Sequence, residues 1–204
     1  AIDFNRSQGE DTRELEETYE KMRNFFEEKQ PNDIDLPEIQ NVKGFIRKSE
    51  AIAGARYAGL EDENIHFMAL PFYETGKKVK NPVTEKDVEL TMELLQQIKP
   101  HQVFAAGDFA DPHGTHIVCF RIILEALTRL RETEEWTKDC WLWMYRGAWQ
   151  EFQIHEIEMA VPLSPQEVKR KRKAIFQHQS QKDRPVFPGD DEREFWVRAE
   201  ERNR

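Results

Sequence analysis

The sequence contains few cysteines and no long hydrophobic run. Cys119 and Cys140 are the only two cysteines in 204 residues, and each stands beside large apolar residues. Two cysteines are too few for a disulfide scaffold, so we expect two buried thiols in a reducing compartment. No apolar stretch approaches the roughly 20 residues of a membrane-spanning helix, and residues 1–4 show no secretory signal. These absences predict a cytoplasmic protein that does not enter a membrane.

Positive charge is also scarce relative to negative charge. The chain has 30 Lys and Arg against 39 Asp and Glu, which gives a formal net charge of -9. Nucleic acids are bound through basic surfaces that neutralise phosphates, so this balance argues against a nucleic-acid partner. A mean hydropathy of -0.81 and a charged fraction of 34% indicate a strongly solvated surface around a single-domain core.

Helical and strand-like segments alternate along the chain. Apolar spacing and capping residues predict helices at 11–29, 38–58, 84–98, 117–131 and 164–177, and a short helix at 191–202. Short apolar runs predict strands at 64–70, 101–106, 140–145 and 156–161, and the composition of 71–82 predicts an exposed loop. This order predicts an α/β fold, a Rossmann-like three-layer sandwich with a largely parallel sheet covered on both faces.

The chain goes almost directly into a charged helix, and no apolar strand precedes residue 64. An α/β domain usually opens with a strand, so we expect the first strand or strands to belong to a longer parent protein. We expect one domain at 1–181 and a polar tail with a short helix at 182–204. A sheet without its first strand would expose unpaired edges, which predicts self-association as a homo-oligomer.

The loop after the second predicted strand has residues suited to chemistry. Between Gly107 and Gly114, and just beyond, it contains Asp108, Asp111, His113 and His116. Ligands of open parallel sheets bind beyond the carboxyl ends of the strands. One imidazole could ligate a metal while the other donates to a developing oxyanion, and the carboxylates could orient either ring. The alternative is that both histidines decorate a surface loop, and this loop alone does not decide between the two.

Two motifs resemble one enzyme family. Residues 110–116, Ala-Asp-Pro-His-Gly-Thr-His before an apolar helix, resemble the second signature of the PIG-L/LmbE zinc-dependent sugar N-deacetylases. Residues 171–181 resemble that family's helix ending in Lys-x-x-Ala-x-x-x-His-x-Ser-Gln. The resemblance extends over roughly 42–181. It implies a metal-dependent hydrolase that removes an acetyl or similar acyl group from the nitrogen of an amino sugar or its phosphate.

The resemblance also implies roles for single residues. His116 matches a zinc ligand, His113 matches the histidine that stabilises the oxyanion, and Asp111 belongs to the same catalytic motif. The family's other zinc ligands and its general base come from a His-Pro-Asp-Asp motif that is absent from this chain. Catalytic zinc normally needs three protein ligands. Zn²⁺ is therefore expected only if the parent protein contains that motif, and this chain alone is expected to be inactive.

Two further residues are candidate substrate ligands. Arg146 follows a predicted strand and could clamp a phosphate or carboxylate, although a surface or ion-paired arginine is the favoured interpretation. His178 could contact the site or cap its helix, and Ser180 could be a turn residue, so structural and functional roles both stay open. The basic run 169–173 covers every face of its helix turn and is expected to be mostly solvated.

A second resemblance suggests a partner. The stretches 63–67 and 141–149 are similar to domains fused behind a glucosamine-6-phosphate deaminase-like domain. This implies an amino-sugar ligand and a fused or associated amino-sugar deaminase-like partner. The alternative function is a non-catalytic sugar-binding or regulatory module attached to such an enzyme. Stoichiometric zinc in the intact protein would separate the two hypotheses.

Overall fold

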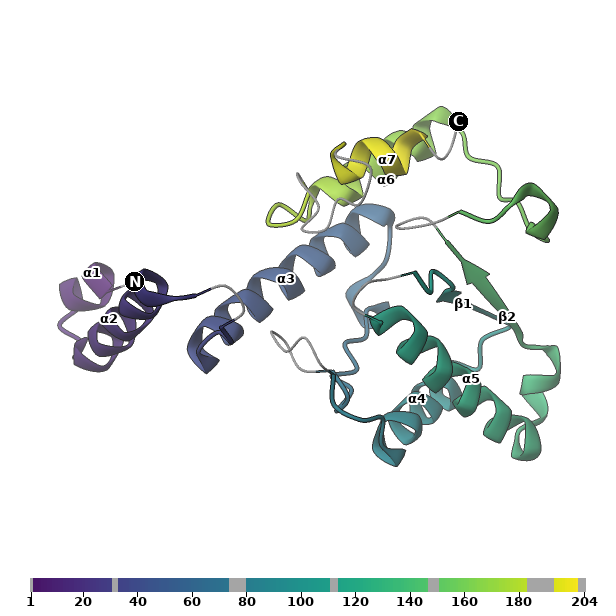
Figure 1. Cartoon of the computed structure of the whole chain (residues 1–204), viewed down its shortest axis with the longest axis horizontal. Coiled ribbons are helices and arrows are strands. Elements are labelled where there is room, and N and C mark those ends of the chain that lie inside the picture. The colour runs from purple at the N-terminus through teal and green to yellow at the C-terminus, as the bar shows by residue number, and fades with distance from the viewer. Residues whose placement is uncertain are drawn as a thin grey trace. The chain divides into compact units, whose positions relative to one another are not determined.

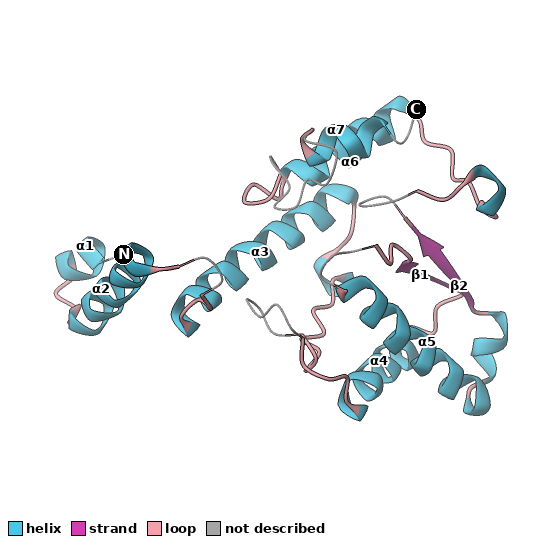
Figure 2. Ribbon diagram, in the orientation of Figure 1, coloured by secondary structure: helices cyan, strands magenta, loops and turns pink. Residues whose placement is uncertain are grey.

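The computed structural model describes residues 2–30, 33–73, 80–110, 114–146, 151–182 and 193–201. Internal packing divides these residues into two units, one up to Ser49 and one from Glu50 onward. Most of the described chain is helical, and two strands form one small sheet (Figures 1 and 2). The protein is therefore a mixed α/β fold with a small open parallel sheet, and the Rossmann-like three-layer sandwich stays a prediction.

Most of the predicted helices are confirmed. The helices are α1 (Ile2–Ser7), α2 (Arg13–Glu28), α3 (Pro37–Ala58), α4 (Glu85–Ile98), α5 (Thr115–Thr133), α6 (Pro165–Phe176) and α7 (Phe195–Glu201), with 3-10 turns η1 (Asp62–Asn64), η2 (Glu135–Asp139) and η3 (Ile154–Glu156). Helices α2 to α6 agree with the predicted ranges, and α7 lies within 191–202. The sequence did not indicate α1, because this short helix buries no residue and leaves no apolar pattern.

Two of the four predicted strands are wrong. Residues 64–70 form the end of η1 and irregular chain, and residues 156–161 follow η3 in the same way. Both segments are apolar, but a strand also needs a neighbour to satisfy its backbone groups, and neither segment has one among the described residues. The predicted exposed loop 71–82 is wrong at one position, since Phe72 is only 1% exposed.

The two confirmed strands are β1 (Gln102–Ala106) and β2 (Trp141–Tyr145), which pair in parallel with Gln102 opposite Trp141. Side chains alternate between the faces of a sheet. Val103 and Leu142 pack against the hydrophobic core on the face toward α5. On the other face Trp141 and Tyr145 are 65% and 55% exposed, so the described residues cover only one face of the sheet.

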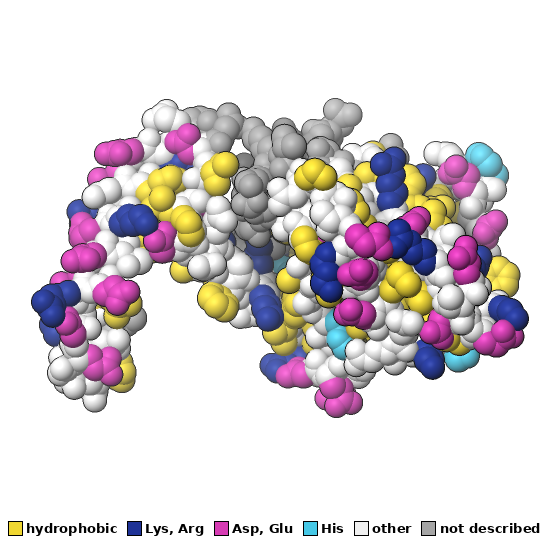
Figure 3. Space-filling model, turned by 90° about the horizontal axis from the view of Figure 1, so that it is seen from below, with side chains coloured by type: hydrophobic (Ala, Val, Ile, Leu, Met, Phe, Trp, Pro, Cys, Tyr) yellow, Lys and Arg dark blue, Asp and Glu magenta, His cyan; other side chains and the backbone are white. Residues whose placement is uncertain are grey.

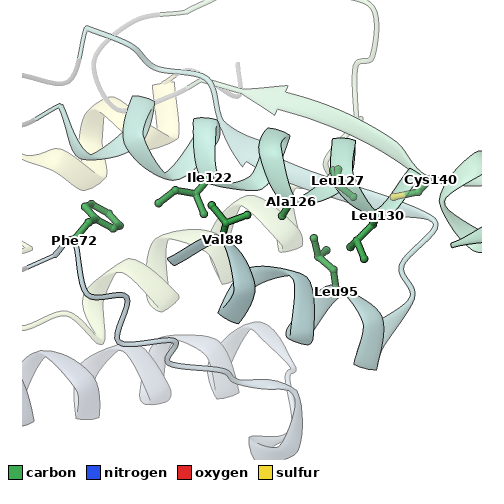
Figure 4. Close-up of a cluster of buried hydrophobic side chains, with 8 residues drawn as sticks. All are labelled: Phe72, Val88, Leu95, Ile122, Ala126, Leu127, Leu130 and Cys140. Carbon is green, nitrogen blue, oxygen red and sulfur yellow. The ribbon is translucent and has the colours of Figure 1, made fainter. Parts of the chain in front are cut away.

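The core of the second unit lies where α5 packs against α4 and β1. Its buried members are Phe72, Val88, Leu95, Ile122, Ala126, Leu127, Leu130 and Cys140 (Figure 4). Ile122, Ala126 and Leu130 follow one another at four-residue spacing, which places them on one face of α5. Figure 4 shows this face turned toward Val88 and Leu95 of α4. The core is therefore a helix–helix interface extended to the sheet.

The first unit consists of α1, α2 and the first part of α3. The predicted apolar stripe of α2 is helical but exposed, with Leu15, Tyr19 and Phe26 between 42% and 55% exposed. The unit is instead rich in ion pairs, such as that of Lys21 with Glu38, whose Nζ and Oε1 atoms are 2.7 Å apart. Hydrophobic side chains stand between charged ones on the face of the molecule in Figure 3 as well.

The sequence predicted two buried thiols and no membrane-spanning helix. Both cysteines are free thiols; Cys140 is buried and Cys119 is half-buried. Burial raises the pKa of the Cys140 thiol, which makes it a weak nucleophile at neutral pH. Across the described residues, no helix combines the length and apolar character needed to span a bilayer.

One buried carboxylate connects a loop to the start of α4. Asp87 is fully buried, and its Oδ1 accepts a hydrogen bond of 2.9 Å from the backbone N of Phe72. Its Oδ2 accepts bonds of 2.8 Å from the backbone N and from the Oγ1 of Thr84, the residue before the helix. Thr84 and Asp87 thus form a capping box at the start of α4, and the same carboxylate ties Phe72 to the core.

Hydrogen bonding sets the ionisation of this group. Burial alone would raise the pKa of Asp87, but the bonds from Phe72 and Thr84 together outweigh it and hold the pKa below its usual value. Because the folded-state pKa is lowered, the carboxylate stabilises the fold above the unfolded pKa of about 3.9. This stabilisation is lost as the pH falls through the folded-state pKa.

We predict that Asp87→Asn lowers the free energy of unfolding by about 2 kcal/mol at pH 7, because buried donors lose a charged acceptor. The deficit relative to wild type should shrink as the pH falls below 4. Urea unfolding at several pH values measures both effects. The control is Asp62→Asn, which disrupts the exposed pair with Arg56 and should cost less than about 1 kcal/mol. Equal losses in the two variants would contradict the role of Asp87.

Candidate functional site

The carboxyl ends of β1 and β2 lie at the same edge of the sheet, where the sequence predicted a site. The pairing continues one residue beyond β1, since the backbone N of Gly107 donates to the O of Tyr145 over 2.8 Å. A Cβ atom added to Gly107 would lie 2.8 Å from the Cβ of Met144, closer than side chains normally approach. Glycine is therefore required here by the close approach of β2.

The loop from Gly107 leads into the first turn of α5. Asp108 is only 2% exposed, and the ring of Phe109 lies 5.3 Å from that of Phe120, which anchors the loop to α5. Gly114 precedes the helix with a φ of 65°, a left-handed conformation that glycine adopts without strain. His116 follows in the first turn and is half-buried. The edge thus combines a buried carboxyl group with a partly accessible imidazole.

The predicted catalytic residues Asp111 and His113 lie outside the described residues, so their roles stay predictions. Of the predicted zinc site, the structure describes only His116. Within the described parts of the chain, no group of three or more His, Cys, Asp or Glu could hold a metal ion. Because a catalytic zinc normally has three protein ligands, the described residues do not by themselves fit a zinc centre.

Arg146 lies at this edge and is held by several contacts. Its Nε donates to the O of Gly107 over 3.2 Å, and its guanidinium lies 4.2 Å from the centre of the Phe152 ring. Its Nη1 also lies 4.0 Å from a carboxylate oxygen of Glu156. These contacts agree with the favoured interpretation of an ion-paired arginine. They also fix the guanidinium beside the ends of β1 and β2, and its contact with substrate stays a prediction.

His178 lies against the second half of α3. The position of a Cβ on Gly54 would be 3.0 Å from the Nε2 of His178 and 3.4 Å from the O of Ala174. Close by, Ser180 binds the carboxylate of Glu50 through its backbone N and its Oγ, both over 2.7 Å. The C-terminal motif therefore docks onto α3 in this structure, and substrate contact by His178 stays a prediction.

Glu50 is the residue of this docking that sequence reasoning missed. It stands four residues before Gly54, so both lie on the same face of α3. The signal available in the sequence was the four-residue spacing of Glu50 and Gly54 in the predicted helix 38–58. A glycine on that face leaves room for another segment to pack, and the carboxylate can accept its hydrogen bonds. The partner, Ser180, is 130 positions away. No local pattern connects residues at such a separation.

The chain is 50% identical over 191 residues to a Bacteroides thetaiotaomicron protein described as glucosamine-6-phosphate deaminase-like. The match covers 93% of this chain and 29% of that protein, so the chain spans less than a third of the length of the curated relative it matches. No family model matches the chain, and no solved structure matches it. The likeness agrees with the expected link to a deaminase-like protein, and membership of the deacetylase family stays a prediction.

We predict that Gly107→Ala lowers the free energy of unfolding by about 1–3 kcal/mol, because the added Cβ must displace Met144 at the edge of the sheet. The matched control is Gly44→Ala in α3, where no atom lies within 4 Å of the new Cβ. That variant should be as stable as wild type or up to about 1 kcal/mol more stable. Urea unfolding followed by circular dichroism measures both. An unaffected Gly107→Ala protein would show that Met144 imposes no constraint.

We further predict an energetic coupling of about 1 kcal/mol between Glu50 and Ser180, since two hydrogen bonds to a carboxylate join them. A double-mutant cycle of Glu50→Ala and Ser180→Ala in urea unfolding measures it. Ser164→Ala is the control, because its Oγ caps α6 and does not contact Glu50. Its effect should add to that of Glu50→Ala. Additive effects for Ser180→Ala as well would mean that the docking bonds do not stabilise the fold.

Proposed function

We propose that this chain is a domain of a larger amino-sugar-handling protein. Its role would be in the metal-dependent removal of an acetyl or similar acyl group from the nitrogen of an amino sugar or its phosphate. The amino-sugar part is supported by the 50% identity to a protein described as glucosamine-6-phosphate deaminase-like. The hydrolytic part is supported by His116, which stands in the first turn of α5, the helix that follows β1 in the chain.

In this proposal His116 provides one ligand to Zn²⁺, and the remaining ligands belong to groups outside the described residues. A bound zinc ion supplies a Lewis acid and lowers the pKa of a coordinated water. The chain's own contribution is positional. The buried Asp108 is proposed to orient polar groups of the loop, as carboxylates around metal-bound histidines commonly do. His113 and Asp111 are proposed to act on the reacting amide.

Arg146 and His178 are the proposed substrate ligands, and the contacts in the structure support Arg146 more strongly than His178. Arg146 is already fixed beside the ends of both strands by Gly107 and Phe152. A guanidinium held in place loses little conformational entropy when it binds an anion, so it suits a sugar phosphate arriving at this edge. His178 packs on α3 through Gly54, and its proposed contact would require a ligand that extends toward α3.

We predict about one zinc per chain in the longer protein that this proposal requires, measured by mass spectrometry of the metal content after dialysis. His116→Ala should lose the metal. The control His155→Ala removes an exposed imidazole and should retain it. The rate of acetate release from N-acetylglucosamine 6-phosphate should fall by about 100-fold or more in His116→Ala and stay at the wild-type level in His155→Ala.

The alternative, a non-catalytic sugar-binding or regulatory module, gives the opposite pattern. Neither wild type nor the two variants would then contain zinc or release acetate. Binding of an amino sugar without turnover would support that module. Zinc retained in His116→Ala would exclude His116 as a ligand even if the protein is a hydrolase.

A further inference from the structure

A hollow of about 450 Å³ opens on the surface of the second unit, between the carboxyl end of α3 and α6. It is lined by Tyr57, Gly59, Gln166, Lys169, Arg170 and Lys173. Three of these side chains are cationic, two carry neutral hydrogen-bonding groups, and none is acidic. Its volume falls in the range of small-molecule sites, which is about 300–1,000 Å³.

The regular geometry of α6 gathers the three cations. Lys169 and Lys173 are one helical turn apart, and Arg170 precedes Lys173 by three residues, so all three project from neighbouring positions on one face. The other two members of the basic run turn toward α7, which lies beside α6 (Figure 1). Arg172 pairs with Glu200 over 3.1 Å, and Lys171 reaches a backbone oxygen of α7. The run is therefore divided between two uses, and four of its five side chains are exposed, which confirms the expectation that most of the run is solvated.

The hollow differs from the surface around it. A neighbouring hollow shares Gly59 but is lined by Glu61, Asp62 and Glu63, and its one cation, Arg56, is paired with Asp62. Glu167 of α6 accepts a hydrogen bond from the backbone N of Ser164 and does not line the basic hollow. Its bonds with Ser164 lower its pKa, and the nearby charge of Arg170 adds to this effect, so Glu167 offsets part of one cation. In a chain of net charge -9, three cations around one depression create a local positive potential against the overall field.

We propose that this hollow binds a small phosphate monoester. The dianionic phosphate would lie among Lys169, Arg170 and Lys173, since guanidinium and ammonium groups are the preferred partners of phosphate oxygens. The hydroxyl of Tyr57 and the amide of Gln166 would bind the hydroxyl groups of the attached sugar. The site is independent of the proposed hydrolytic chemistry, because none of its residues belongs to the edge formed by β1 and β2; the choice of an amino sugar as the attached group rests on the proposed function.

The docking of α3 on the C-terminal motif builds this site. Glu50 binds Ser180, and Gly54 lies against His178, so the carboxyl end of α3 is held close to α6. The cations face the end of a helix that carries a partial negative charge. Lys169, Arg170 and Lys173 could therefore stabilise the end of α3 instead of binding phosphate, and the test below distinguishes these two roles.

The test is isothermal titration calorimetry of the full chain with glucosamine 6-phosphate, glucosamine and inorganic phosphate. We expect binding of glucosamine 6-phosphate, competition by inorganic phosphate and no detectable binding of glucosamine. The variant Lys169→Gln/Lys173→Gln should weaken binding by about 10-fold or more, since two charge-assisted contacts are lost. The single variant Arg170→Gln should also lower the affinity for glucosamine 6-phosphate. Binding should also weaken with added salt.

Two controls make the result specific. Lys86→Gln/Lys138→Gln removes the same charge from exposed lysines that pair with Glu89 and Glu135, and it should change affinity by less than about twofold. His155→Ala, which removes an exposed imidazole outside both proposed sites, should bind the phosphate ester as wild type does. An equal loss in the control pair, or unchanged affinity in Lys169→Gln/Lys173→Gln, would overturn the site. A lowered melting temperature with unchanged affinity would assign the cations to α3 instead.

Discussion

The burial of one face of α5 is the constraint on which the second unit depends. Ile122, Ala126 and Leu130 of this helix have at most 2% of their surface exposed, because α4 and β1 close over them. His116 stands in the first turn of the same helix, so the packing of α5 constrains the position of this candidate residue. Asp87 adds a polar counterpart at the start of α4, since its buried charge is satisfied by backbone and hydroxyl donors. Core and candidate site therefore share one rigid element.

A second constraint acts on the other side of this unit, where the C-terminal motif meets α3. The bonds between Glu50 and Ser180 and the close approach of His178 to Gly54 hold the two segments together. Residues that resemble a catalytic signature in sequence thus also organise the packing of two helices. The basic hollow is a consequence of this docking, because its lining comes from both α3 and α6. The resemblance of residues 171–181 to a catalytic signature and their packing against α3 are therefore two separate properties of the same segment.

Local and non-local interactions explain which elements the sequence predicted. Helices α4 and α6 were predicted from apolar spacing and capping residues, because these signals lie within a few residues of one another; the structure shows a capping box at the start of each. The strands at 64–70 and 156–161 were predicted wrongly, since an apolar run shows that a segment avoids water but not that a partner strand is available. The burial of Phe72 was missed for a similar reason, since it depends on a partner distant in the chain. The backbone N of Phe72 donates to Asp87 of α4, and this bond holds the residue against the core.

Helices α2 to α6 and the acidic balance of charge follow from the sequence alone. Each of these depends on neighbours within a turn or on composition. Tertiary packing alone sets the division of the basic run between α7 and a hollow, the bond of Arg146 to Gly107 and the bond of Ser180 to Glu50. These contacts join residues far apart in the chain, and burial and geometry, which set their strength, exist only once the elements have packed.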